Sequence, residues 1–129
     1  LIEVMIAVLV LSIGLLGISA LQALGLRSSY GAYLGSQAAL LAYDMSDRIR
    51  ANPNFATQYR VDCTANPAPA NALALADVTE WCNSLAGLLP SGTGSVAGNG
   101  NNFQINVSWR DNQLDPEADP WSFNIEIEL

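Results

Sequence analysis

Residues 1–26 read LIEVMIAVLVLSIGLLGISALQALGL, and this stretch decides the fold. From Val4 to Leu26 it contains no charged residue and no proline. About 23 residues at 1.5 Å each make a helix of roughly 34 Å, long enough to cross a hydrocarbon core of about 30 Å. A cleaved secretory signal is the main alternative, but its apolar region has only about 7 to 15 residues. The stretch therefore predicts a membrane-spanning helix over residues 1–26.

The helical pattern continues beyond this apolar stretch without a break. Apolar and aromatic side chains recur at steps of three or four, which is one stripe of an amphipathic helix. They are Tyr30, Leu34, Ala38, Leu41, Met45 and Ile49. Asn52-Pro53 ends the pattern, because proline disfavours helical geometry in the residue before it and cannot donate the next backbone hydrogen bond. We expect one helix to about Arg50, with residues 27–50 as its amphipathic half.

The segment after this helix is rich in Asn, Pro and Ala, and we expect a loop from Asn52 to Asp77. Asp77 followed by Glu80 resembles a capping box, so a short helix is expected to begin there. Its apolar residues at helical spacing are Val78, Trp81, Cys82, Leu85 and Leu89. Pro90-Ser91-Gly92 is expected to end it.

The last part of the chain alternates as β-strands do. Two runs carry an apolar residue at every second position, which is the pattern of a strand with one buried face. The first contains Phe103, Ile105, Val107 and Trp109, and the second contains Trp121, Phe123, Ile125, Ile127 and Leu129. Asn99-Gly100 favours a tight turn, so a weaker strand at residues 95–97 is expected to form a hairpin with the first run.

Together these patterns predict an α+β fold. A three-stranded antiparallel sheet would cover the second half of the long N-terminal helix and bury the apolar faces of both. Residues 51–129 would then form a globular head with one short extra helix. Residues 1–26 would lie in a membrane.

The charges are distributed unevenly along the chain, whose net charge is −7. Residues 1–50 contain three acidic residues and three arginines, whereas residues 51–129 contain nine acidic residues against Arg60 and Arg110. There is no lysine or histidine. An acidic surface repels phosphate backbones, so we expect no nucleic-acid partner.

The only two cysteines, Cys63 and Cys82, lie in the acidic half. Without histidine or further cysteine they cannot complete a zinc site of four such ligands. A disulfide would close a loop of roughly 20 residues, contribute about 3 kcal/mol in the chain-entropy model and require an oxidising compartment. We expect this disulfide, and the alternative is a pair of buried free thiols.

Catalytic chemistry finds little support in the sequence. The glycines at 92, 94, 98 and 100 lie between a helix and a strand, which is the wrong context for a phosphate loop. Four acidic residues in the last loop could offer oxygen ligands to calcium, but their spacing does not match a calcium-binding loop. They are Asp111, Asp115, Glu117 and Asp119. We expect a solvated acidic loop, no metal, no cofactor and no enzymatic activity.

Glu3 is the one residue in residues 1–26 whose charge suggests a function. A charged side chain costs about 2.5 to 3.5 kcal/mol at the centre of a bilayer, and less near an end. Glu3 is thus either a carboxylate at the level of the lipid headgroups or a group that needs a partner. The physics alone leaves both open.

Several segments resemble type IV pilins and pseudopilins. The run Leu1 to Leu11, with its single acid at Glu3, resembles the start of the mature chain in this family. The resemblance to PilV-type minor pilins in particular extends over further segments. These are Ser12 to Gly17, Leu21-Gln22, Ala42 to Pro53, Trp81, Leu88-Leu89-Pro90, Gly92 and Val107 to Arg110.

This resemblance implies a type IV pilin fold, in which a long helical spine lies under an antiparallel sheet. It also implies that residues 1–26 form the filament-core half of that helix after assembly. It implies processing by a prepilin peptidase, methylation of the new N-terminus, and pairing of Glu3 with the terminal amine of a neighbouring subunit during assembly. The implied partners are other minor pilins, the major pilin and a tip adhesin. The implied location is the inner membrane with a periplasmic head, then the surface pilus of a Gram-negative bacterium. The leader and cleavage site lie outside this sequence, so processing is an expectation from resemblance alone.

The leading hypothesis is a minor pilin that primes pilus assembly and sits at or near the tip, with roles in adhesion and twitching motility. A minor pseudopilin of a type II secretion system is the first alternative, because it shares the helix. A DNA-receptor pilin is disfavoured by the acidic head. An ordinary single-pass protein with a periplasmic binding domain is the alternative from another class.

Overall fold

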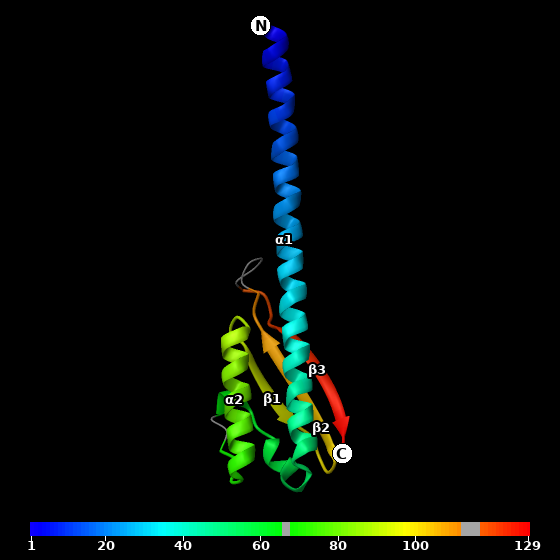
Figure 1. Cartoon of the computed structure of the whole chain (residues 1–129), viewed down its shortest axis with the longest axis vertical. Helices are drawn as coiled ribbons and strands as arrows, with labels where there is room; N and C mark the ends of the chain where they lie inside the picture. The colour runs from blue at the N-terminus through cyan, green and yellow to red at the C-terminus, as the bar shows by residue number, and fades with distance from the viewer. Residues whose placement is uncertain (66–67, 112–116) are drawn as a thin grey trace. The chain divides into compact units, whose positions relative to one another are not determined.

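The computed structural model describes residues 1–65, 68–111 and 117–129 (Figure 1). The elements in chain order are α1 (Ile2–Ala51), the 3-10 helices η1 (Pro53–Tyr59) and η2 (Cys63–Ala65), α2 (Ala72–Leu88), β1 (Thr93–Ala97), β2 (Asn102–Trp109) and β3 (Trp121–Glu128). Two compact units divide the chain, Leu1–Tyr33 and Leu34–Leu129, and α1 contributes to both. The α+β class is confirmed, and the elements match a pilin-like fold.

Helix α1 ends where the sequence predicts. Asn52 N donates to Ile49 O at 3.2 Å, and Pro53 begins η1 directly afterwards. The predicted stripe is buried from Leu34 to Ile49, and every member of it in this range is at most 9% exposed. The second half of α1 is therefore a core helix of the unit Leu34–Leu129, which we call the head unit.

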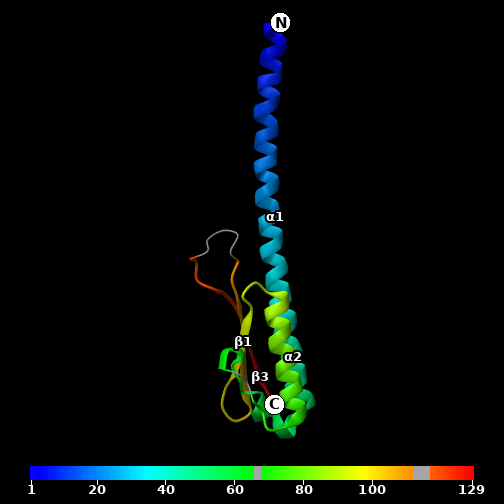
Figure 2. The ribbon, with the colours of Figure 1, turned by 90° about the vertical axis from the view of Figure 1, so that its left-hand side faces the viewer.

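The sheet of the head unit has the order β1-β2-β3, and both strand pairs are antiparallel. The predicted hairpin at Asn99-Gly100 is confirmed, with the left-handed φ values at Gly98 and Gly100 that such a turn requires. Helix α2 and the head-unit part of α1 cover the same face of the sheet (Figure 2).

The core lies between this sheet face and the two helices. Trp81 of α2 is fully buried, and its indole Nε1 donates to Leu41 O of α1 at 2.8 Å. Gly94 of β1 gives this ring its space, because a Cβ there would lie 2.5 Å from Trp81 Cη2. Trp81 thus joins α1, α2 and β1 through one side chain.

The predicted start of the short helix is wrong. Helix α2 begins at Ala72, five residues before Asp77, and Asn71 is its N-cap residue, whose side chain accepts from Ala74 N at 3.0 Å. Alanine and leucine at residues 72–76 favour a helix, so the helix starts earlier than predicted. Asn71 then lies where its side chain can pair with an N–H group of the first turn. Asp77 and Glu80 are interior residues of α2 rather than a capping box.

The predicted burial of the sheet holds for β2 and only in part for β3. The inward residues of β2 are at most 6% exposed. On β3, Phe123, Ile125 and Ile127 are half-buried, and Trp121 is 60% exposed. One edge of the sheet is therefore incompletely covered.

Candidate functional site

The first unit of the chain presents an apolar surface on all sides. Its large apolar residues are 53 to 75% exposed from Ile2 to Leu26. Among the described residues, one helix, α1, is long and apolar enough to cross a membrane, judged by length and composition. This supports a membrane anchor, whereas the narrower assignment of residues 1–26 to a filament core stays a prediction.

Two serine hydroxyls of this unit are bonded within the helix. The hydroxyl of Ser12 donates to Val8 O at 2.6 Å, and that of Ser19 donates to Leu15 O at 2.9 Å. A hydroxyl bonded to the carbonyl one turn earlier needs no partner from lipid or from another helix. The exposed surface around Val4, Val8 and Ser12 is therefore mostly apolar, which suits contact with lipid or with another helix.

Glu3 lies in the first turn of α1 and is exposed. A carboxylate there is favoured by the helix dipole, because the first N–H groups of a helix lack backbone partners. Its role in subunit assembly stays a prediction, since that pairing needs a second subunit.

An ion cluster joins the two helices of the head unit. Arg48 of α1 contacts Asp44 on its own helix at 2.9 Å, and Asp77 and Glu80 of α2 at 3.1 Å each. Burial by itself disfavours the guanidinium charge, but Glu80 and Asp44 outweigh it through hydrogen bonds and opposite charge, which raises the pKa of Arg48. Arg48 therefore stays charged and fixes α2 against α1.

Tyr59 completes this cluster from η1. Its buried hydroxyl donates to Asp77 Oδ2 at 2.5 Å and accepts from Asn52 Nδ2 at 3.3 Å. Burial disfavours the phenolate, and the hydrogen bond to Asp77 adds to this, so the pKa of Tyr59 is raised. The carboxylate of Asp77 thus accepts hydrogen bonds from α1 and from η1, and it holds both elements against α2.

Tyr59 makes the head unit sensitive to alkaline pH. Because its folded pKa is raised, its contribution to stability is fully present below about pH 10, the ordinary tyrosine pKa, and is lost as the pH rises through the folded pKa. We expect the free energy of unfolding of the full chain in detergent to fall as the pH rises above about 10.

Tyr59→Phe removes the titrating group, so the fall should be shallower than in the wild type. Tyr43→Phe is the matched control, because it keeps Tyr59 and alters a ring that is 57% exposed. Identical alkaline slopes for the wild type and Tyr59→Phe would contradict this prediction.

The two cysteines form a disulfide. Cys63 of η2 and Cys82 of α2 are joined with a Cα–Cα distance of 5.6 Å and a sequence separation of 19. The bond ties the segment after η1 to the middle of α2. Such a bond stabilises a fold by restricting the unfolded chain.

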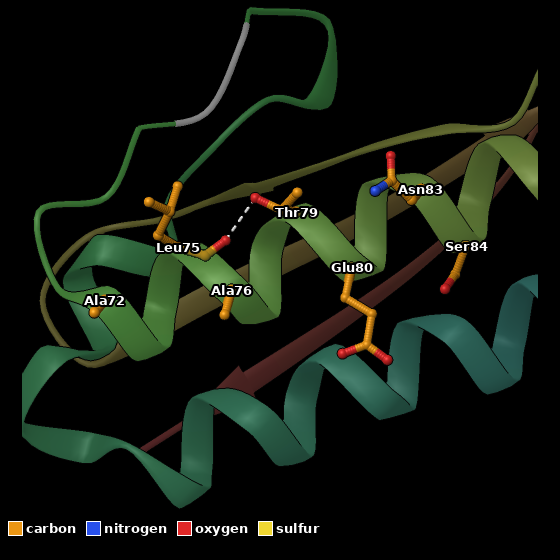
Figure 3. A pocket seen from close by; sticks show the side chains of 7 residues that line it. All are labelled: Ala72, Leu75, Ala76, Thr79, Glu80, Asn83 and Ser84. Atoms are coloured by element: carbon orange, nitrogen blue, oxygen red, sulfur yellow. Dashed lines mark hydrogen bonds between the residues drawn. The ribbon is translucent and has the colours of Figure 1, made fainter.

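The outer face of α2 forms an open hollow (Figure 3). It is lined by Ala72, Leu75, Ala76, Thr79, Glu80, Asn83 and Ser84. Thr79 donates its hydroxyl to Leu75 O at 2.6 Å, and Glu80 already binds Arg48. The lining therefore offers neither a nucleophile beside a base nor a second carboxylate.

The predicted loop of four acids cannot be described as one group. Asp115 lies outside the described residues. Within residues 1–65, 68–111 and 117–129, no three His, Cys, Asp or Glu side chains come together as metal ligands would. The absence of metal, cofactor and catalysis stays a prediction.

Sequence reasoning missed the Arg48 cluster. The sequence pattern predicts Asp77 and Glu80 at the start of a helix, where they would act as a capping box. Asp77 and Glu80 are three apart, so they lie on one face of a helix that begins earlier. An N-cap at Asn71 was the signal that would have placed them there.

No protein-family model, curated protein or solved structure matches this chain. The likeness to pilins therefore consists of the sequence segments described above and a fold compatible with theirs.

Proposed function

We propose that this chain is a minor pilin of a type IV pilus, of the PilV type. It primes pilus assembly together with other minor pilins and the major pilin, and it sits at or near the pilus tip. A tip adhesin is a further candidate partner. It acts as a structural subunit and not as an enzyme, and nucleic acid is not among its partners.

The observation that carries this proposal is the change of surroundings along the single helix α1. Its side chains are exposed and mostly apolar through Leu26, yet the stripe from Leu34 to Ile49 is buried in the head unit. An ordinary anchor needs only the first of these parts. A helix that serves both lipid and a folded domain suits a subunit that leaves the membrane with its helix intact.

In this proposal the helix first spans the inner membrane with the head in the periplasm. The disulfide fits that location, because disulfides persist in oxidising compartments. After processing by a prepilin peptidase, the apolar half exchanges lipid for the helices of neighbouring subunits. Glu3 then pairs with a neighbour's N-terminal amine, because a charge buried without a partner is strongly destabilising.

Disruption of the gene in the producing bacterium tests this function. Surface pili and type II secretion are measured in the same strain, and a plasmid copy provides the control for restoration. We expect few or no surface pili, normal secretion, and recovery of pili with the plasmid. Lost secretion with normal piliation would contradict the proposal and favour a minor pseudopilin.

A further inference from the structure

The two edges of the sheet differ in how they are covered. At the β1 edge, Val96 N donates to Val61 O at 2.8 Å, and Asp62 forms a bridge with Ser95. At the β3 edge, no backbone hydrogen bond from the described parts of the chain reaches the strand from outside. Strand β3 lies on the side of the sheet away from α2 (Figure 1). The β1 edge is therefore partly paired, whereas the β3 edge is left open by residues 1–65, 68–111 and 117–129.

The register shows which backbone groups are open. Leu129 N donates to Asn101 O at 3.0 Å, which directs the odd-numbered residues of this segment toward β2. Backbone groups of an antiparallel strand alternate in direction, so those of the even residues face outward. They belong to Ser122, Asn124, Glu126 and Glu128. The same alternation directs Val96 N of β1 outward, where Val61 meets it.

Apolar surface lies beside this open edge. Phe123, Ile125 and Ile127 are half-buried on the inward face, although their partners on β2 are at most 2% exposed. Tyr43 of α1 lies 6.4 Å from Phe123 between ring centroids and is itself 57% exposed. Leu40, on the same side of α1 as Tyr43, is 63% exposed. A seam between α1 and β3 thus remains apolar and partly open.

We propose that the β3 edge binds an extended segment of another protein as a fourth, antiparallel strand. Its apolar residues would alternate with lysine or arginine. The apolar residues would lie in the seam beside Phe123 and Tyr43. The basic residues would lie on the outer face, opposite Glu126 and Glu128.

An extended strand would pair the open backbone groups of this edge and also cover the apolar seam. An added strand pairs the outward N–H and C=O groups and delivers a side chain to the seam at every second residue. A docked helix would leave the backbone groups unpaired. A second copy of this chain would bring its own net charge of −7, so charge disfavours it.

This inference goes beyond the proposed function, because it names a surface and a class of partner. It depends only on the geometry of the head unit. If the β3 edge binds no such strand, the proposed function is unaffected. If the proposed function is wrong, the β3 edge can still bind a strand.

Binding of designed peptides to the full chain in uncharged phosphatidylcholine nanodiscs tests the inference. The probe is a capped nine-residue peptide of alternating lysine and valine. We expect it to slow amide hydrogen exchange at the even residues from Ser122 to Glu128 and to shift the fluorescence of Trp121 to the blue. A peptide N-methylated at its lysines keeps the charges but cannot donate to the edge, so it should bind at least about tenfold more weakly.

Charge variants provide the second arm. Glu126→Lys changes the net charge by two at the edge, and Thr79→Lys with Asn83→Lys makes the same change on the outer face of α2. All three side chains are exposed, so the fold should survive. Glu126→Lys should weaken peptide binding about fivefold, and the α2 double variant should weaken it little.

Three results would overturn the inference. The first is equal affinity for the N-methylated and unmodified peptides. The second is equal weakening by the two charge variants, which would mean unspecific attraction. The third is dimerisation of the chain through β3 in sedimentation experiments, which would make a second copy the occupant.

Discussion

Trp81→Ala is expected to lower the free energy of unfolding of the head unit by about 4 kcal/mol, within the usual range for truncating a buried tryptophan. The ring is fully buried between α1, α2 and β1, and its indole supplies a buried hydrogen bond to Leu41 O. Removing the ring leaves a cavity and an accepting carbonyl without that donor. Urea unfolding of the full chain in detergent, followed by the fluorescence of Trp109, measures the loss.

Trp121→Ala is the matched control for this prediction. It removes the same side chain from a position that is 60% exposed, so the loss should be below about 1 kcal/mol. Similar losses for the two variants would mean that Trp81 is not the centre of the core.

Replacing both cysteines by serine is expected to lower the free energy of unfolding by about 3 kcal/mol. The disulfide restricts the unfolded chain over its separation of 19 residues, and it fixes η2 to α2. Urea unfolding of the wild type with and without reductant provides an independent measure of the same loss. Reductant should not affect the double serine variant. Equal midpoints for the oxidised and reduced wild type would contradict the prediction.

The parts of the fold that were predictable depend on local patterns. The buried stripe of α1 repeats every three or four residues, and Pro53 ends the helix through its own ring. Strands β2 and β3 alternate strictly, so their inward faces were readable from the sequence. In each case the deciding interactions lie within one element.

The parts that were missed depend on contacts between elements. Asn71 lies in a segment rich in Asn, Pro and Ala, where an N-cap and a loop residue look alike in sequence. Asp77 meets Arg48 only after α1 and α2 have packed together. The apolar residues of β3 match those of β2 in pattern, yet the two helices cover only β2 fully. Coverage of a strand depends on its place in the sheet, which periodicity does not encode.

The candidate functional residues also divide into those predicted from local patterns and those that depend on contacts between elements. The cysteine pair was predictable because no other ligand was present, and the disulfide is confirmed. The assembly role of Glu3 stays a prediction. The Arg48 cluster and the open β3 edge needed three-dimensional structure. Partner surfaces on a head domain generally arise from such placements, so sequence patterns alone identify them poorly.

In the proposed function, the apolar half of α1 passes from a membrane into a filament with Glu3 as its pairing group. The most direct test compares wild type, Glu3→Ala and the control Ser12→Ala in the producing bacterium. The amount of each chain is measured in the inner membrane and in sheared surface filaments. We expect all three chains to insert equally in the membrane. The amount of Glu3→Ala in filaments should be at least about tenfold lower than that of the wild type, because a charged amine would be left unpaired in an apolar core. Equal amounts of wild type and Glu3→Ala in the filaments, or absence of the wild type from them, would contradict it.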